Sequence, residues 1–223
     1  MRSWRLGQAR HRAFLEDHAA LGKGLLSLYQ TDFNPRWYQG CIEQAEEILL
    51  HFTDPQGGFF DTGGDHETLI ARPKSMQDSP MPSGNTLAVE LLLRLSALSG
   101  ERRYSEAAEA AIRAMQDIAS RHPTSFAGWL SNLDFAIGPQ LQLALMGQPE
   151  AQDFQSLAAT IRGRFMPNLV IAGGLGSMDG DPQLLKGRQS IEGKATAYLC
   201  RSFSCNLPTT SPVELIEQLE AAP

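Results

Sequence analysis

The segment from residue 57 to residue 85 holds the densest group of side chains that could do chemistry. Asp61 follows two phenylalanines, and Asp78 lies five residues before Ser83. A pair of loop carboxylates above a cavity suits general acid–base catalysis, in which one group donates a proton and another accepts one. Aspartate is also common in turns that have no chemical role. Asp61 and Asp78 are therefore candidate catalytic residues, with turn formation as the alternative.

Metal binding is the second chemistry that this segment could support. Its candidate ligands are close together in the sequence: Asp61, Asp65, His66 and Glu67. Oxygen-rich loops can bind calcium, but the segment has neither the twelve-residue spacing of an EF-hand nor the paired histidines of a zinc site. We therefore expect no metal ion and no other cofactor, and we expect His66 to face solvent.

Two further acids, Glu16 and Asp17, lie at the start of a predicted helix. Negative charge is favourable at a helix N-terminus, so helix capping alone could explain both residues. In the functional interpretation one of them points into a cavity, because glycoside hydrolysis uses two carboxylates and epimerisation needs a proton donor and a proton acceptor. The sequence leaves both interpretations open.

The three cysteines do not form a redox or metal motif. Cys200 and Cys205 are separated by four residues, whereas thioredoxins and zinc knuckles use C-x-x-C. We expect both to be buried free thiols, and we expect Cys41 to be a core residue. Three cysteines in 223 residues do not amount to a disulfide framework, which favours a reducing cytoplasm.

The composition excludes several classes of partner. The chain has 19 basic and 25 acidic side chains and a net charge of -6, which disfavours a surface that follows nucleic-acid phosphates. Its most apolar stretch, residues 87–98, contains Glu90 and Arg94 and is too short to cross a bilayer. The N-terminal arginines are not followed by the apolar region of a secretory signal. We expect a cytoplasmic protein that binds neither nucleic acid nor membrane.

The elements that must position these residues are mostly helices. Apolar residues recur at three- and four-residue steps in five segments, which predict helices over residues 10–29, 34–52, 83–99, 101–121 and 125–137. Asn34 and Pro35 are typical of a helix start, and Gly100 is typical of a helix end. The first two helices repeat in the next two at an offset of 67, so that Leu25 aligns with Leu92. Short turns at one end and a long loop at the other are typical of stacked hairpins with function at the loop end.

The pattern changes to α/β after residue 138. Alternating or fully apolar stretches predict strands, and amphipathic stretches predict helices, in the order 140–147 (strand), 149–165 (helix), 168–174 (strand), 194–205 (strand) and 211–222 (helix). We therefore expect a helical domain over residues 1–138 and a small α/β domain over residues 139–223. The glycines after residue 172 lack the G-x-G-x-x-G spacing of a nucleotide-binding loop.

Four phrases of the sequence together resemble one protein family. They are "FLEDHAALGKGLLSLYQTDFNPRW", "GGFFDT", "RPKSMQDSPMPSGNTLAVELLLRLSALSGERRY" and "AYLCRSFSCNLPTTSPVELIEQL". In this order they are similar to the C-terminal part of the YyaL-like thioredoxin-domain proteins, whose animal members are called spermatogenesis-associated. The resemblance implies a mostly α fold, a partial (α/α)6 toroid of helical hairpins followed by a small α/β C-terminal subdomain. The thioredoxin domain of that family has no counterpart here, so its redox activity is not implied.

The resemblance also implies where the candidate residues lie. Such toroids occur in N-acylglucosamine 2-epimerases and six-hairpin glycosidases, and their inner helices begin at the end where substrates bind. The loop over residues 57–85 would then cover the mouth of the cavity. We predict two sets of site residues, catalytic Asp17, Asp61 and Asp78, and ligand-binding Glu16, Ser83, Asn85 and Trp129. Trp129 would stack on a sugar ring, although aromatic residues at helical spacing usually belong to the core.

Two functions are compatible with these observations. The first is binding or conversion of a carbohydrate-like ligand in the toroid cavity, by analogy of fold. The alternative is a non-enzymatic interaction module. Five helices cannot close a ring that the family completes with twelve, so the first and fifth helices should expose apolar residues. The exposed apolar residues would then pack against a second copy of the chain or against a separately encoded N-terminal half.

Overall fold

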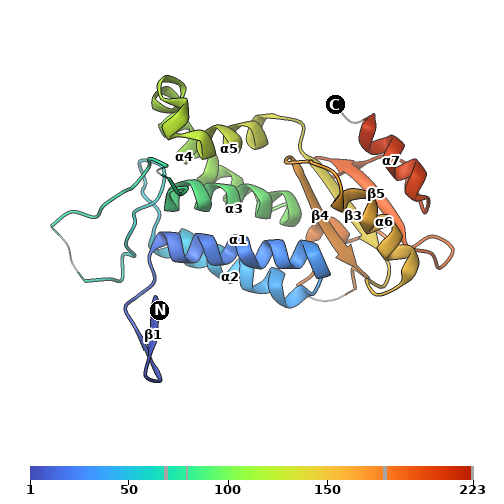
Figure 1. Cartoon of the computed structure of the whole chain (residues 1–223), viewed down its shortest axis with the longest axis horizontal. Coiled ribbons are helices and arrows are strands. Elements are labelled where there is room, and N and C mark those ends of the chain that lie inside the picture. Colours follow the sequence, from blue (N-terminus) through green and yellow to red (C-terminus); the bar gives the residue numbers. More distant parts are fainter. Residues whose placement is uncertain (68–69, 79, 178–179, 222–223) are drawn as a thin grey trace. The chain divides into compact units, whose positions relative to one another are not determined.

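The computed structural model describes residues 1–67, 70–78, 80–177 and 180–221. The chain forms two compact units, and each is assembled from several segments (Figure 1). The helical unit comprises Met1–Leu26, Gln39–Ser96 and Glu101–Ala136, and the sheet unit comprises Ser27–Tyr38, Ala97–Gly100 and the chain from Ile137 onward. In the described part of the chain, no helix is both long and apolar enough to cross a membrane.

The predicted mostly helical architecture with a C-terminal α/β part is confirmed. The helices before the sheet are α1 (Leu15–Asp32), α2 (Pro35–His51), α3 (Gly84–Ser99), α4 (Arg102–Arg121), the short 3-10 helix η1 (Pro123–Ser125) and α5 (Ala127–Ile137). Gly100 follows α3 with a φ of 73°, a left-handed conformation that glycine adopts without a steric cost. Five residues in the centre of α3 are fully buried: Ala88, Val89, Leu91, Leu92 and Leu95 are each 0% exposed.

The first helix starts later than the sequence predicts. The residues before it form an exposed antiparallel hairpin of β1 (Ser3–Arg5) and β2 (Gln8–Arg10), with Trp4 opposite Ala9. Leu6 and Gly7 both have positive φ, as the central residues of a tight hairpin turn require. Residues 1–12 are exposed, whereas Leu15 is 1% exposed. Burial therefore begins with the helix.

Helices α1 and α3 are neighbours that run in the same direction. Near their starts, a Cβ added at Gly84 would lie 3.1 Å from the backbone nitrogen of Glu16. Further along, the ammonium of Lys23 contacts the carboxylate of Glu90, and these two residues are separated by 67 positions. This separation equals the offset of the sequence repeat. The repeat therefore relates two helices that pack side by side.

The sheet unit contains a mixed sheet with the strand order β4-β3-β5-β6. Its elements are β3 (Leu141–Met146), α6 (Gln152–Arg162), β4 (Leu169–Gly174), the 3-10 helix η2 (Gln183–Leu185), β5 (Thr196–Arg201), β6 (Ser204–Cys205) and α7 (Pro212–Glu220). β4 is parallel to β3, as expected for strands joined by a crossover helix, and β5 is antiparallel to β3. The hydroxyl of Ser211 accepts a hydrogen bond from the N–H of Glu214 and caps α7.

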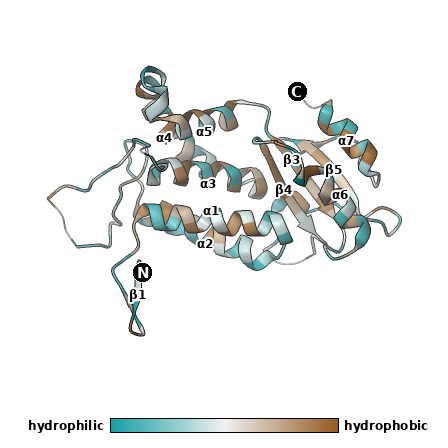
Figure 2. Ribbon diagram, viewed as in Figure 1, coloured by the Kyte–Doolittle hydropathy of each residue, from teal (hydrophilic) through white to brown (hydrophobic). Residues whose placement is uncertain are grey.

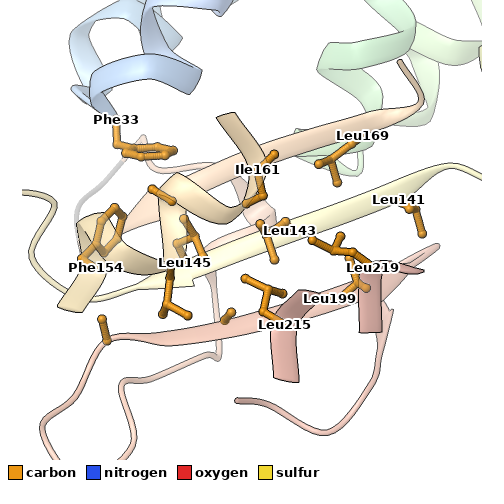
Figure 3. Close-up of a cluster of buried hydrophobic side chains, with 14 residues drawn as sticks. Phe33, Leu141, Leu143, Leu145, Phe154, Ile161, Leu169, Leu199, Leu215 and Leu219 are labelled. Atoms are coloured by element: carbon orange, nitrogen blue, oxygen red, sulfur yellow. The ribbon is translucent and has the colours of Figure 1, made fainter. Parts of the chain in front are cut away.

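Helices α6 and α7 cover one face of this sheet. Leu143 and Leu145 of β3 form a buried cluster with Phe154 of α6 and with Leu215 and Leu219 of α7 (Figure 3). All six residues of β3 are buried, which is expected for a central strand. Figure 2 shows the corresponding hydrophobic colouring along β3 and β4. The apolar runs that predict these strands in the sequence therefore form the core of this unit.

The segment 194–205 is a hairpin and not the single strand that the sequence predicts. β5 and β6 pair in antiparallel fashion, with Cys200 directly opposite Cys205. These two cysteines form a disulfide bond, so the expectation of two free thiols was wrong. The chain reverses at Ser202 and Phe203, a pair that is not a typical turn sequence, and the return strand therefore could not be predicted. Cys41 is free and buried in the helical unit, as expected.

Candidate functional site

Asn85 holds the loop between α2 and α3 against the start of α3. Its side chain is 0% exposed. The amide oxygen accepts a hydrogen bond from the N–H of Phe59 (2.7 Å), and the amide nitrogen donates to the C=O groups of Phe59 (2.8 Å) and Ser75 (3.1 Å). One buried amide therefore joins two separate parts of the loop. Because its partners are backbone groups, losing Asn85 would leave buried polar atoms unpaired.

Asp78 joins the same loop to the starts of two helices. Its Oδ1 accepts hydrogen bonds from the N–H of Ser83 (2.9 Å) and the hydroxyl of Thr86 (2.7 Å), and its Oδ2 accepts from the N–H of Gly128 (3.0 Å). Ser83 is the N-cap of α3, since its hydroxyl accepts from the N–H of Thr86 (3.1 Å). A carboxylate is favourable here because each helix N-terminus carries a partial positive charge.

Trp129 holds the loop from α5. Its side chain is 2% exposed, and its indole N–H donates a hydrogen bond to the C=O of Met76 (2.7 Å). Buried tryptophans usually pair their N–H in this way. The ring therefore presents no open face to a ligand in this structure, and Trp129 joins Asn85 and Asp78 as a residue that positions the loop.

The start of α1 uses two more of the predicted acids. The Oδ2 of Asp17 accepts a hydrogen bond from the N–H of Phe14 (2.9 Å), which is one half of a capping box. Asp61 lies on the loop, and its carboxylate accepts from the N–H (2.9 Å) and the hydroxyl (2.6 Å) of Ser75. The C=O of Asp61 also accepts from the N–H of Leu15 (3.0 Å). Asp61 thereby fixes the loop to the first residue of α1.

A pocket of about 550 Å³ lies between the loop and the starts of α1 and α3. Three of the predicted residues line it, Glu16, Asp61 and Ser83. The guanidinium of Arg2 lies 2.5 Å from the carboxylate of Glu16 and 4.6 Å from the ring centre of Phe14. The pocket thus combines carboxylates, a cation and an aromatic ring. Its other lining side chains include Ser75, Gln77, Met81 and Pro82.

The structure separates the predicted site residues into two groups. Those that line the pocket are Glu16, Asp61 and Ser83. Those that do not line it are Asp17, Asp78, Asn85 and Trp129, and the polar groups of all four are hydrogen-bonded to backbone groups. The pocket lining also includes Ser75 and Gln77, which were not predicted. Both lie inside the phrase "RPKSMQDSPMPSGN", whose resemblance to the family could have identified them. Arg2 reaches the pocket from the β1–β2 segment, which the sequence does not reveal.

A second group of ionisable side chains lines a smaller pocket of about 240 Å³, among them His18, Glu47, His51, Asp65 and His66. The side chain of His66 is only 11% exposed, so the expectation that it faces solvent was wrong. Its ring packs 6.0 Å from that of Phe14 and 6.1 Å from that of Phe52, centre to centre. Burial, followed by the charges of Arg12 and Arg72, lowers the pKa of His66. Among the described residues, no three His, Cys, Asp or Glu side chains are arranged to hold a metal ion.

Comparison with known proteins gives relatives along nearly the whole chain. No protein-family model matches the sequence. The chain is 28% identical over 215 residues to spermatogenesis-associated protein 20 of Mus musculus, which covers 91% of this chain and 26% of the mouse protein. The Homo sapiens protein of the same name is 28% identical over 212 residues, and uncharacterized protein B0495.5 of Caenorhabditis elegans is 24% identical over 216 residues. The chain therefore spans about a quarter of the length of the curated relatives that it matches.

Proposed function

We propose that the helical unit is part of a ring of helical hairpins, a partial (α/α)6 toroid in which α1 and α3 are inner helices. Two observations support this. α1 and α3 start at the same end and pair Lys23 with Glu90 at the repeat offset. Arg103 of α4 pairs with Glu46 of α2 at 2.6 Å, so the second helices of the two hairpins also contact each other. Such contacts are expected where hairpins stack as successive repeats.

Within this unit, the proposed function is binding of a small carbohydrate-like ligand in the pocket lined by Glu16, Asp61 and Ser83. One observation carries the proposal: charged groups of both signs and an aromatic ring meet at the common start of two parallel helices. A sugar offers hydroxyl groups to polar side chains and a C–H face to a ring. The pocket volume of about 550 Å³ lies within the range of about 300–1,000 Å³ typical of small-ligand sites.

The two lining carboxylates have different proposed roles. The side chain of Glu16 is 54% exposed, and Arg2 orients it, so it can accept hydrogen bonds from ligand hydroxyls. Asp61 is held by Ser75 and offers a carboxylate of fixed orientation. Asp17 and Asp78 do not line the pocket, and they are engaged in capping and anchoring. Any acid–base conversion of the ligand would therefore fall to Glu16 and Asp61, and the proposed activity is binding.

Titration with N-acyl hexosamines, followed by NMR of backbone amides, tests this function. Chemical-shift changes are expected around residues 14–16 and 75–84, with a dissociation constant in the millimolar range or below. Glu16→Gln should weaken binding about tenfold, because a charge-assisted hydrogen bond is worth roughly 1.5–3 kcal/mol. Glu109→Gln is the matched control, since Glu109 is an exposed carboxylate on α4 that also pairs with an arginine. Absence of shifts at millimolar ligand would rule the proposal out.

A second candidate function is favoured by the exposed apolar residues of α1. Leu21 and Leu28 lie seven residues apart on one face of this helix and are 53% and 45% exposed. At the end of α5, Ile137 is 76% exposed. On these observations the chain would be a non-enzymatic interaction module, and its proposed partner is a second copy of the chain that covers the α1 face.

Sedimentation velocity at increasing protein concentration tests the second candidate. The wild type should form a dimer, and Leu21→Glu with Leu28→Glu should keep it monomeric, because two buried leucines contribute roughly 1.5–3 kcal/mol each. Leu50→Glu is the control, since Leu50 is 74% exposed on α2. A wild-type protein that stays monomeric at high concentration excludes this candidate and leaves the ligand-binding proposal unaffected.

A further inference from the structure

The disulfide of the sheet unit closes an unusually small hairpin. Cys200 and Cys205 are one of only two residue pairs that join β5 to β6, the other being Arg201 and Ser204. The two turn residues, Ser202 and Phe203, both have positive φ (46° and 64°). Residues other than glycine adopt this conformation at a cost in energy, and the cost is largest for bulky side chains. The covalent bond therefore stabilises a turn whose sequence does not favour it.

The two sulfur atoms of this bond differ in accessibility. Cys200 is 1% exposed, whereas Cys205 lies on the exposed strand β6. Cys205 is therefore the more accessible of the two cysteines to an external thiol. Attack on a disulfide depends on which sulfur is accessible and on how well the other sulfur leaves as a thiolate.

Arg188 lies beside both sulfur atoms. Its Nη2 is 2.9 Å from the sulfur of Cys205 and 3.5 Å from that of Cys200. Its other terminal nitrogen donates to the C=O of Leu184, which keeps the guanidinium in place. A cation next to sulfur favours the thiolate over the thiol. Sulfur in a disulfide is only a weak acceptor, whereas a thiolate carries a full negative charge, so the guanidinium would stabilise the reduced pair more than the disulfide.

We propose that Cys200, Cys205 and Arg188 form a thiol–disulfide exchange site that takes two electrons from a dithiol reductant. The reductant's first thiolate attacks the sulfur of Cys205 and forms a mixed disulfide, while the bond to Cys200 breaks and Cys200 leaves as a thiolate beside Arg188. The reductant's second thiolate then attacks its own sulfur in the mixed disulfide and releases the Cys205 thiolate. The reductant becomes a cyclic or intramolecular disulfide, and both cysteines end as thiols after protonation.

The site would control the order of the hairpin. After reduction, the turn keeps the hydrogen bond from the N–H of Phe203 to the side chain of Gln142 (2.7 Å), and the side chain of Gln142 donates in turn to the C=O of Ala97 (2.7 Å). These neutral bonds replace a covalent closure. The exposed Cys205, next to Arg188, is the nucleophile that would re-form the bond with an oxidant of the disulfide class.

The first experiment uses the unmodified chain. The folded protein is equilibrated with dithiothreitol and its oxidised form at graded ratios, trapped with iodoacetamide and mapped by mass spectrometry. We expect Cys200 and Cys205 to be reduced together while circular dichroism shows that the chain stays folded, and we expect Cys41 to stay unmodified, since burial raises its pKa to about 12. A bond that dithiothreitol reduces only after denaturation, or that never forms, would overturn the proposal.

The second experiment separates the roles of the two cysteines. Cys200→Ser leaves Cys205, and Cys205→Ser leaves Cys200, each beside Arg188. Oxidised glutathione should form a mixed disulfide with Cys205 at least about tenfold faster than with Cys200, because thiolate character and exposure both favour it. Equal rates would contradict the proposal.

Arg188 is tested by the pH dependence of Cys205 alkylation in the Cys200→Ser background. Arg188→Met should move the midpoint to higher pH and slow the reaction at pH 7, and Arg188→Lys should restore part of the rate. Arg201→Met is the matched control, since Arg201 is an exposed arginine of the same hairpin that follows Cys200 and points to the opposite face of the strand. A profile that Arg188→Met and Arg201→Met change equally would assign Arg188 a purely structural role.

Discussion

The loop between α2 and α3 and the β5–β6 hairpin are two irregular segments that are fixed in opposite ways. The loop is fixed by the buried side chains of Asn85 and Trp129, which hydrogen-bond to its backbone, and by the half-buried carboxylate of Asp78. The hairpin is fixed by one covalent bond across a turn of unfavourable conformation. The stability of the loop should therefore depend on several individual polar groups and on pH, whereas the stability of the hairpin should depend on redox conditions.

The largest expected effect is in the loop. Asn85→Ala removes three hydrogen bonds and leaves the N–H and C=O of the buried Phe59 unpaired, together with the C=O of the exposed Ser75 without this donor. We expect the free energy of unfolding to fall by about 3 kcal/mol or more, since each such group costs roughly 1–3 kcal/mol. Urea titration followed by circular dichroism measures the change. Gln116→Ala on the exposed face of α4 should change it by less than about 0.5 kcal/mol. Equal effects of the two substitutions would show that the loop is not held by Asn85.

Reduction of the hairpin should have the next largest effect. Breaking the disulfide between Cys200 and Cys205 opens a short loop, and the chain-entropy relation gives about 2 kcal/mol for a closure of this length. Thermal unfolding with and without dithiothreitol measures the loss. The same reductant should have no effect on Cys205→Ser, which lacks the bond. If reductant does not change the stability of the wild type, the disulfide does not stabilise the hairpin.

A smaller effect is expected where the loop meets α5. Trp129→Phe keeps most of the buried ring but removes the donor to the C=O of Met76. We expect a loss of about 1 kcal/mol from this single hydrogen bond, together with faster amide exchange in residues 75–78. Hydrogen exchange measured by mass spectrometry tests the second part. Trp4→Phe, in the exposed β1 strand, should leave both quantities unchanged.

The smallest effect concerns pH. Burial lowers the pKa of His66 in the folded protein, with the charges of Arg12 and Arg72 acting in the same direction. The unfolded chain therefore binds a proton more readily. This contribution to stability is fully present above pH 6.5, the ordinary pKa of a histidine, and is lost as pH falls from there toward the lower pKa of the folded state. We expect a loss of less than about 1 kcal/mol between pH 7.5 and pH 5, and His66→Gln should abolish that part of the dependence. A steeper loss in His66→Gln than in the wild type would contradict this.

The sequence predicts the helices well because their signals are local. Pro35 is the first residue of α2, and Gly100 directly follows the last residue of α3. The apolar strands β3 and β4 lie where they were predicted. The β5–β6 hairpin was missed because Ser202 and Phe203 do not resemble a tight turn. No local signal indicates that residue 205 returns to face residue 200.

Only part of the candidate site was predicted, because the sequence does not show which residues meet in the fold. Residue types identified Glu16 and Asp61, and the family resemblance pointed to Ser83; all three line the pocket. The sequence also selected Asp78 and Asn85, whose hydrogen-bond partners include backbone groups up to 50 residues away in the chain. A carboxylate that anchors a loop and a carboxylate that meets a ligand look alike in sequence. Both Asp61 and Asp78 accept hydrogen bonds from a backbone N–H and a hydroxyl, and only the fold shows that Asp61 lines the pocket whereas Asp78 does not.

The position of Asp78 has a consequence for regulation. One carboxylate receives hydrogen bonds from Thr86 in α3 and from Gly128 at the start of α5. A molecule that enters the pocket and tightens the neighbouring loop segment would therefore also reduce the freedom of α5. By thermodynamic reciprocity, anything that immobilises α5 from outside would raise the affinity of the pocket by the same factor. A partner that binds far from the pocket could thus act as an effector without contacting the ligand.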